Sequence, residues 1–475
     1  MHRNFINGQF IAPDHETRIA VLNPANGREI SFIPDSSAES AQQAVAAARA
    51  AQPSWARLPA VARSAHLREI ASRLRGKSHA IAKIISEEQG KLLSLAQVEV
   101  DFTADYMDYM AEWARRIEGE VIPSDRADET ILLFRQPIGV VAGILPWNFP
   151  FFLIARKMAP ALVTGNTIVI KPSEETPNNA ALFTELLAAT DLPPGVFNLV
   201  YGRGETIGQA LASHPDVGLI SFTGSVQAGM AIMAAAAPNI TKLSLELGGK
   251  APAIVMPDCD IDLAVNAVKS SRIINSGQVC NCAERIYVHD KVADEFTSKL
   301  ASAMSATTYG DPLGDRAVDM GPLINPGAMK RVGGMVDRAV ADGAEIVAGG
   351  KADDRRGGAF FQATVLTNCR QDMEIMRDEI FGPVAPIHII HDLDEAIAKA
   401  NDSIYGLTSS IYTRQLNTAL RACHELQFGE TYINRENFEA MQGFHAGVRR
   451  SGVGGADGKH GVYEFTQTHV VYMRN

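Results

Sequence analysis

The spacing of hydrophobic and polar positions changes near residue 138 of the chain. Before that point the sequence is rich in Ala and charged residues, as in SAQQAVAAARAA and LREIASRLRGKSHAIAKIISEEQGK, which is typical of helices. Ser36 and Glu39 have the spacing of a capping box, so we expect a helix to begin there, and Pro53 and Pro59 to interrupt the helices that follow. The sequence therefore predicts a helical segment over residues 36–118.

From residue 138 onward, short apolar runs alternate with helical stretches. The runs GVVAGIL, NTIVIK, VFNLVYG, VGLISFTG and TKLSLEL are separated by segments such as TPNNAALFTELLAAT and VQAGMAIMAAAA. A second alternating region begins at APAIVMPD and continues through ERIYVHD to PVAPIHII. Such alternation is typical of βαβ units with a parallel sheet, so we predict an α/β protein with two α/β domains.

Two further apolar stretches, ETILLFRQ and THVVYMRN, are predicted to be strands with no obvious partner nearby in the sequence. Strands of this kind commonly extend the sheet of a neighbouring subunit. We therefore expect a homo-oligomer.

Length and composition narrow the class of protein. A chain of 475 residues with 46% hydrophobic residues has room for two or three domains, and its net charge of −10 argues against a nucleic-acid partner. The most apolar run, from Gly139 to Ala155, is too short and too rich in proline to span a membrane. The N-terminus resembles neither a secretory signal nor a transit peptide, so we predict a cytoplasmic protein.

The five cysteines form neither a disulfide framework nor a zinc site. Their number is odd, they are widely spread, and neither CxxC pairs nor a His cluster accompanies them. They are Cys259, Cys280, Cys282, Cys369 and Cys423. We expect no metal.

A dinucleotide would bind where strands of a parallel sheet end. The segment YGRGETIG has the wrong glycine spacing for the dinucleotide fingerprint. FTGS ends a predicted strand and opens a helix, so Ser225 could face a phosphate, although an ordinary turn is the alternative. In IKPSE, Lys171 and Glu174 could bind ribose hydroxyls, with a solvated Lys as the alternative. The charge of Glu174 would favour NAD over NADP.

The stretch NSGQVCNCAER contains the best candidate for a nucleophile. A thiolate at Cys280 would be favoured by a helix or loop N-terminus, although a buried, inert cysteine is the alternative. Glu246 in LELGGK could activate water, and Asn148 in LPWNFP could hold an oxyanion. Together these three residues suit acyl chemistry through a thioester.

The order of the motifs PWNFP, KPSE, FTGS, LELGGK, GQVC, EIFGP and NDSIYGL resembles that of NAD(P)-dependent aldehyde dehydrogenases, from end to end of the chain. The resemblance implies that Cys280 is the nucleophile and that Glu246 is the base for deacylation. It implies an oxyanion hole made by the Asn148 amide and the Cys280 backbone N–H. It also implies a set of NAD contacts: Trp147, Lys171, Glu174, Ser225, Glu379 and Phe381.

The resemblance also implies a division of the chain. A Rossmann-like NAD-binding domain is expected over residues 1–118 and 138–248, and a catalytic α/β domain over residues 249–448. A small β extension for oligomerisation is expected over residues 119–137 and 464–475.

Three polar residues bear on the choice of aldehyde: Arg156, Glu439 and His445. They match the substrate contacts of a bacterial branch of the family that oxidises short 2-hydroxy aldehydes such as lactaldehyde and glycolaldehyde. An alternative is succinate semialdehyde, because that branch also has a CxC at the nucleophile and an Arg at the position of Arg156. In that alternative Cys282 could close a redox disulfide with Cys280; otherwise it packs. Val448 departs from the pattern, where a larger aromatic residue would be expected to wall the pocket.

Overall fold

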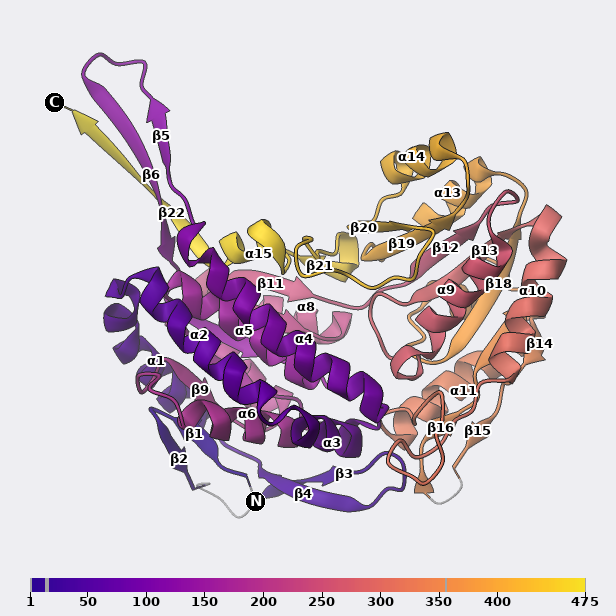
Figure 1. Ribbon diagram of the computed structural model, residues 1–475, viewed down its shortest axis with the longest axis horizontal. Helices are drawn as coiled ribbons and strands as arrows, with labels where there is room; N and C mark the ends of the chain where they lie inside the picture. The colour runs from indigo at the N-terminus through magenta and orange to yellow at the C-terminus, as the bar shows by residue number, and fades with distance from the viewer. Residues whose placement is uncertain (1, 13–16, 355–356, 475) are drawn as a thin grey trace.

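The computed structural model describes residues 2–12, 17–354 and 357–474. The described elements form two α/β bodies side by side, and a narrow three-stranded sheet projects away from them (Figure 1). The C-terminal strand runs toward the tip of this projection. The α/β class predicted from the sequence is confirmed, with one predominantly parallel sheet in each body.

The first body contains an eight-stranded sheet in the order β2-β1-β9-β8-β7-β10-β11-β21. Its strands are β1 (Asn4–Ile6), β2 (Gln9–Ile11), β7 (Val140–Ile144), β8 (Thr167–Lys171), β9 (Phe197–Leu199), β10 (Val217–Thr223), β11 (Lys242–Glu246) and β21 (Gly452–Val453). The central strands β9, β8, β7, β10 and β11 run parallel. From β7 the chain passes outward through β8 and β9, then returns to β10 on the other side. A crevice for a ligand is expected at such a reversal, at the carboxyl ends of the strands.

Helices cover both faces of this sheet, which explains the nearly continuous apolar runs of its strands. Val141 and Leu219 belong to a core with α2 (Ala60–Arg75), α4 (Leu93–Glu112) and α5 (Pro150–Thr164). Val140 and Ile220 belong to a core on the other face with α1 (Ala38–Arg57), α7 (Gln209–Ala212) and α8 (Val226–Ala236). The remaining helices of this body are α3 (Ser78–Gln89), α6 (Asn178–Ala188) and α15 (Gly458–Glu464).

The start of the helical segment differs from the prediction. The N-cap of α1 is Ser37, whose side chain makes no capping hydrogen bond. The hydroxyl of Ser36 instead accepts a hydrogen bond from Asn4 Nδ2 at 2.9 Å, so the expected capping box with Glu39 is wrong. Pro53 lies inside α1 rather than between helices, because buried side chains on both sides of it hold the helix in place. Pro59 does separate α1 from α2.

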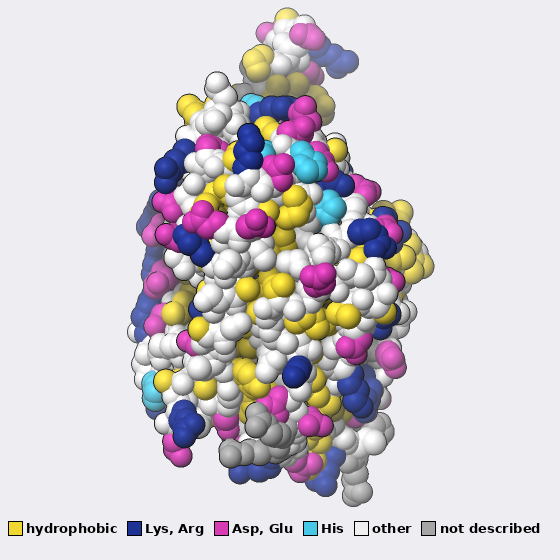
Figure 2. All heavy atoms as spheres, turned by 90° about the vertical axis from the view of Figure 1, so that its right-hand side faces the viewer, with side chains coloured by type: hydrophobic (Ala, Val, Ile, Leu, Met, Phe, Trp, Pro, Cys, Tyr) yellow, Lys and Arg dark blue, Asp and Glu magenta, His cyan; other side chains and the backbone are white. Residues whose placement is uncertain are grey.

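The second body contains a seven-stranded sheet in the order β14-β17-β18-β13-β12-β19-β20, in which β14 alone runs antiparallel to its neighbour. Its strands are β12 (Ala251–Val255), β13 (Ala283–His289), β14 (Glu345–Ala348), β17 (Thr364–Thr367), β18 (Val384–Ile390), β19 (Thr408–Tyr412) and β20 (Glu430–Ile433). Its helices are α9 (Ile261–Ile273), α10 (Asp290–Ser305), α11 (Pro326–Ala341), α12 (Glu374–Arg377), α13 (Leu393–Asn401) and α14 (Leu416–Glu425). On the face shown in Figure 2, basic and acidic side chains are interspersed.

The projecting sheet has the order β22-β6-β5. Its strands are β5 (Glu120–Pro123), β6 (Glu129–Pro137) and β22 (Thr466–Arg474). β6 and β22 pair antiparallel from Thr466 opposite Pro137 to Arg474 opposite Glu129. The two strands that lacked a partner nearby in the sequence are therefore partners of each other.

Small hairpins complete the fold: β3 (Arg18–Leu22) with β4 (Glu29–Pro34), and β15 (Ala352–Asp353) with β16 (Phe360–Phe361). Among the described helices, none has the length and apolar character that a membrane crossing requires. The apolar run from Gly139 to Ala155 divides into β7, a turn and the first part of α5.

Candidate active site

A cavity of about 350 Å³ lies at the carboxyl ends of β7, β10 and β11. Residues of both bodies line it. All of the predicted site residues except two are among them: Trp147, Asn148, Arg156, Ser225, Glu246, Cys280, Glu379, Phe381, Glu439 and His445. The exceptions are Lys171 and Glu174, which lie at the end of the neighbouring strand β8.

Cys280 lies in a turn directly before β13, after a short 3-10 segment (Ile274–Gly277). The turn is tightly wound, since Asn275 and Ser276 have φ angles of 47° and 57°. Of the two expected settings for this thiol, a helix or a loop N-terminus, the structure has a loop that leads into a strand. Burial raises the pKa of Cys280, while a hydrogen bond with His445 and the charge of that imidazole act to lower it.

Glu246 is the last residue of β11, and its side chain is buried. Neither of its carboxylate oxygens has a hydrogen-bond partner among the described residues. Burial raises the pKa of Glu246 to about 7, against the lowering effect of the His445 and Arg156 charges. A buried carboxylate without a protein partner, titrating near neutrality, is suited to accept a proton from water.

Asn148 follows β7 and points toward the turn that carries Cys280. Its Nδ2 donates to the carbonyl of Gln278 at 3.0 Å, and its own backbone carbonyl accepts from Lys91 Nζ at 2.7 Å. Lys91 is buried in an ion pair with Glu99, which also accepts the N–H groups of Phe151 and Phe152 at the start of α5. The sequence reading missed this supporting pair, since nothing local connects residues 91, 99 and 148.

Arg156 projects from α5 into the cavity between two carboxylates. Its Nε donates to Asp457 Oδ1 at 3.0 Å, its Nη2 donates to Asp457 Oδ2, and its Nη1 lies 3.5 Å from Glu439 Oε1. Glu439 Oε2 also accepts from Asn281 Nδ2 at 2.6 Å. Asp457 was not predicted. It is nevertheless the strongest partner of Arg156, and it is 2% exposed.

His445 is held by carboxylates on two sides. Its Nδ1 lies 2.7 Å from Glu430 Oε1, and its Nε2 lies 3.6 Å from Glu246 Oε2. Burial lowers the pKa of His445, but the charge of Glu439 and the hydrogen bonds with Cys280 and Glu430 raise it well above its ordinary value. His445 thus lies between the thiol of Cys280 and the carboxylate of Glu246. Glu430, at the start of β20, is another residue that sequence reasoning missed.

The residues expected at the nicotinamide side lie together at one wall of the cavity. The rings of Trp147 and Phe381 meet edge to face, with centroids 5.5 Å apart. Glu379 Oε1 accepts the N–H of Gly249 at 2.9 Å. A Cβ atom on Gly248 would lie 2.4 Å from Glu379 Oε2, so only glycine lets the carboxylate approach this closely. Burial and the charge of Glu284 raise the pKa of Glu379 to about 7.

The residues expected at the adenosine side follow β8 and β10. Ser225 is the N-cap of α8, and its hydroxyl accepts the N–H of Ala228 at 3.2 Å. Lys171 Nζ lies 3.1 Å from Glu174 Oε2, and Glu174 Oε1 accepts the N–H of Gly204 at 2.6 Å. Small residues and a helix N-terminus at this edge of the sheet fit a dinucleotide phosphate.

Two further residues named in the sequence analysis, Val448 and Cys282, lie outside the polar end of the cavity. Val448 is 44% exposed and is not among the described residues that line the cavity. Cys282 is buried, and its Sγ donates to the carbonyl of Ser271 at 2.6 Å. Burial raises the pKa of Cys282 to about 12, which disfavours the thiolate needed for disulfide exchange. The five cysteines are all free thiols, and no cluster of metal ligands occurs within the described ranges.

Comparison with known proteins agrees with this geometry. The chain matches the model of the Aldehyde dehydrogenase family over residues 10–471. The chain belongs to the aldehyde dehydrogenase family. Lactaldehyde dehydrogenase of Escherichia coli is 58% identical over 474 residues, which cover 100% of this chain and 99% of the relative. A crystal structure of the Escherichia coli enzyme superposes with a TM-score of 0.99 at 59% identity, covering 100% of this chain and 99% of that chain.

Two further aldehyde dehydrogenases are less similar to this chain than the lactaldehyde dehydrogenase of Escherichia coli. Succinate-semialdehyde dehydrogenase [NADP(+)] of Escherichia coli is 39% identical over 98% of this chain and 96% of its own length. Betaine aldehyde dehydrogenase of Staphylococcus aureus, solved in complex with NAD+, has a TM-score of 0.96 at 34% identity, covering 99% of this chain and 94% of that chain. Relatives of this aldehyde dehydrogenase thus include one solved with NAD+ bound and one named for NADP(+).

Proposed function

We propose that this aldehyde dehydrogenase oxidises short 2-hydroxy aldehydes, such as lactaldehyde and glycolaldehyde, to the corresponding acids with NAD. The observation that carries the proposal is the polar end of the cavity, where Arg156, Glu439 and His445 lie in the same cavity as Cys280. A hydroxyl next to the aldehyde can donate to Glu439 and accept from His445. The 58% identity to a lactaldehyde dehydrogenase supports the same substrate class.

In the proposed reaction, the thiol of Cys280 first releases its proton to solvent, and the thiolate sulfur then attacks the aldehyde carbon. The new oxyanion is held by the side-chain amide of Asn148 and the backbone N–H of Cys280. The imidazolium of His445 stabilises the thiolate, since opposite charges lie close together in a buried site. When bound, the coenzyme would supply the hydride acceptor, and the substrate carbon would be left as a thioester of Cys280.

Release of the acid depends on Glu246. Its unpartnered carboxylate accepts a proton from a water molecule, and the resulting hydroxide attacks the thioester carbon. The C–S bond breaks and the acid leaves. The proton held by Glu246 then passes to the Cys280 sulfur and regenerates the thiol. A base at this position makes water, rather than a second thiol, the acceptor of the acyl group.

The residues at the strand ends fit a nicotinamide dinucleotide. Trp147, Glu379 and Phe381 would hold the nicotinamide ribose side, and Ser225 would hold the pyrophosphate. Lys171 and Glu174 would bind the adenosine ribose. Glu174 carries a negative charge where NADP has its additional phosphate, so we propose NAD as the preferred coenzyme. The Glu174 side chain is 30% exposed, so solvent screens part of this preference.

Succinate semialdehyde is the alternative substrate, and the ion pairs of Arg156 argue against it. A distal carboxylate would need an available cation, but Arg156 already faces Asp457 and Glu439. A third carboxylate beside these two would be repelled. The relatives named for succinate semialdehyde are also less similar to this chain.

We further propose that residues 1–118 and 138–248 are the NAD-binding domain, residues 249–448 the catalytic domain, and residues 119–137 and 464–475 the oligomerisation strands. The projecting sheet supports a homo-oligomer, because β22 and β5 each leave one edge free within the described sheet. Val121, Val470 and Tyr472 on these strands are 74%, 41% and 67% exposed, which suits burial against another subunit.

The test is a comparison of kcat/KM for lactaldehyde, glycolaldehyde, propionaldehyde and succinate semialdehyde with NAD and with NADP. Propionaldehyde is the matched control, because it differs from lactaldehyde only by the hydroxyl. We expect lactaldehyde to exceed propionaldehyde by about tenfold or more, which is ~1.4 kcal/mol. A higher value for succinate semialdehyde would replace the proposal with the alternative.

A further inference from the structure

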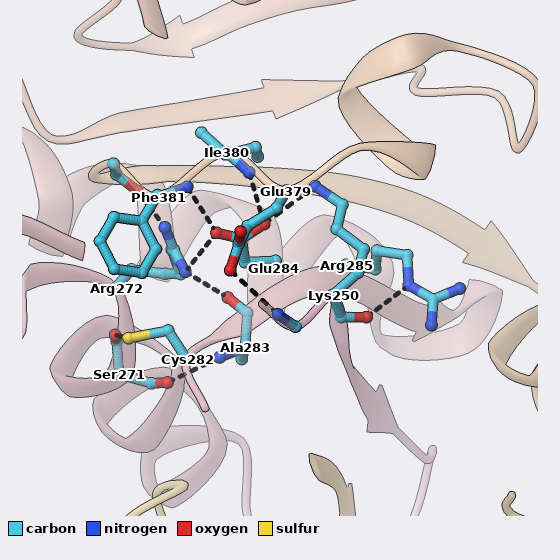
Figure 3. A network of polar contacts seen from close by, with 12 residues as sticks. Lys250, Ser271, Arg272, Cys282, Ala283, Glu284, Arg285, Glu379, Ile380 and Phe381 are labelled. Atoms are coloured by element: carbon cyan, nitrogen blue, oxygen red, sulfur yellow. Dashed lines mark hydrogen bonds and ion pairs between the residues drawn. The ribbon is translucent and has the colours of Figure 1, made fainter. Parts of the chain in front are cut away.

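A buried charged network lies beside the coenzyme wall, which is the part of the cavity lined by Trp147, Glu379 and Phe381. Figure 3 shows this network, whose Lys250, Arg272 and Glu284 the proposed mechanism does not use. Its centre is Glu284, in β13 and four residues after Cys280, with a side chain that is 2% exposed. Lys250 Nζ lies 3.1 Å from Glu284 Oε2, and Arg272 Nη1 lies 3.7 Å from Oε1. Burial alone would raise the pKa of Glu284, but Lys250 and Arg272 keep it below its ordinary value.

The same carboxylate holds two successive amides of the EIFGP segment. Ile380 N donates to Glu284 Oε2 at 2.7 Å, and Phe381 N donates to Oε1 at 2.8 Å. Arg272 holds the other side of the segment, donating to the carbonyl of Gly382 and, at 3.0 Å, to the carbonyl of Ala283. The segment is therefore fixed through its backbone, independently of what its side chains contact.

This restraint matters because Phe381 has a φ angle of 52°. A bulky residue adopts this left-handed conformation only where its surroundings enforce it. In this conformation the Phe381 ring meets Trp147, and the preceding Glu379 lies against Gly249. A relaxed backbone at Phe381 would turn both side chains away from their places in the cavity wall.

We propose that Glu284 is a positioning residue for the coenzyme. By binding the amides of Ile380 and Phe381 it fixes the left-handed turn, and thereby sets how Glu379 and Phe381 face the nicotinamide ribose. Since Glu284 belongs to the strand that follows Cys280, the same carboxylate also fixes the coenzyme wall relative to the nucleophile. The inference rests on the proposed coenzyme role of Glu379 and Phe381.

Glu284→Gln tests the inference. Each of the two carboxylate oxygens of Glu284 accepts one backbone N–H group, whereas the side-chain amide of Gln has a single oxygen. Two quantities are measured: the Kd for NADH, by its fluorescence, and coenzyme-free hydrolysis of p-nitrophenyl acetate, which needs Cys280 but no coenzyme wall. We expect the Kd to rise by about tenfold or more, which is ~1.4 kcal/mol. Ester hydrolysis is expected to stay near that of the parent. An unchanged Kd would overturn the proposal. A raised Kd accompanied by an equal loss of ester hydrolysis would also overturn it.

Glu374→Gln is the matched control, because Glu374 precedes the same segment but pairs with Arg338 at the surface. It is expected to leave both quantities unchanged. Glu284→Asp covers the case in which Glu284→Gln does not fold, since it keeps the charge but is too short to hold both amides. A raised Kd in the Asp variant supports the proposal, and an unchanged Kd overturns it. If neither variant folds, the carboxylate serves the fold itself and the proposal is rejected.

Phe381→Ala separates this inference from the proposed function. If Phe381→Ala leaves the Kd for NADH unchanged, the proposed coenzyme role of Phe381 is wrong. If Phe381→Ala raises the Kd and Glu284→Gln does not, the positioning role of Glu284 alone is wrong.

Discussion

Arg156 and Asp457, which are 301 residues apart in the sequence, form a buried two-point ion pair at the cavity. Arg156 Nε lies 3.0 Å from Asp457 Oδ1, and the side chains are 7% and 2% exposed. The pair fixes the guanidinium plane, and only Nη1 is left to face Glu439. Arg156 therefore orients the carboxylate of Glu439 and is not available to bind a carboxylate on the substrate.

Breaking this pair should cost stability. In Asp457→Asn the guanidinium stays buried without its charge partner, so we expect the free energy of unfolding to fall by about 3–5 kcal/mol. Asp105→Asn is the control, because Asp105 faces Arg75 at the surface with 62% of its side chain exposed, and such pairs contribute about 0–1 kcal/mol. Denaturant unfolding of both variants measures the difference, and equal losses would contradict the expected importance of burial.

The rate of thioester hydrolysis should follow the charge of Glu246. Its pKa is raised to about 7 by burial, and only the carboxylate can accept a proton from water. Deacylation should therefore be slow at acidic pH, rise through about pH 7 and level off above it. Stopped-flow turnover at saturating substrate measures this profile.

Glu246→Gln separates the two halves of the reaction. We expect one burst of NADH per site followed by turnover reduced by about 100-fold or more, without the step near neutral pH. Steady turnover at the parent rate would reject Glu246 as the base.

Glu430 should control the charge of His445. The hydrogen bond from Nδ1 contributes to the raised pKa of His445, so Glu430→Gln should lower that pKa. A less positive imidazole stabilises the Cys280 thiolate less, and the pH midpoint for alkylation of Cys280 by iodoacetamide should move upward. Tyr432→Phe is the control, because it removes only the hydroxyl that hydrogen-bonds to Glu430. A midpoint that stays in place in Glu430→Gln would refute the coupling.

The two cysteines of the CxC motif should behave differently. Cys280→Ala should abolish NADH formation while NADH still binds, because the thiol is the only proposed nucleophile. Cys282→Ser keeps a donor for the Ser271 carbonyl, so its turnover should stay within about twofold of the parent. A loss of turnover on oxidation of the parent that a reductant reverses, and that Cys282→Ser does not show, would instead indicate the redox disulfide.

The parallel strands could be predicted from the sequence because their signal is local. β7 and β8 are buried throughout and β10 is buried over most of its length, and their apolar runs identify them without knowledge of their neighbours. Asn148, Ser225 and Glu246 lie at or just after the carboxyl ends of β7, β10 and β11. The structure brings these residues together in one cavity with Cys280.

What could not be predicted depends on contacts between distant segments. Asp457 lies in a glycine-rich stretch, GGADGKHG, where nothing local indicates that its partner is Arg156 on α5. Glu430 pairs with His445 across a turn that has no periodic pattern. The incorrect prediction of a capping box at Ser36 has the same cause, because the Ser36 hydroxyl accepts a hydrogen bond from the distant Asn4 in β1.

The last segment of the chain has a consequence for synthesis on the ribosome. Residues 445–474 return to the first sheet and to β6, and they contain His445, Asp457, β21 and β22. A nascent chain therefore carries Cys280 and Glu246 long before it has the imidazole and the carboxylate that complete their surroundings. The surroundings of the thiol are complete only after residues 445–457 have been made, so a product truncated before them should be inactive even if its nucleophile is intact.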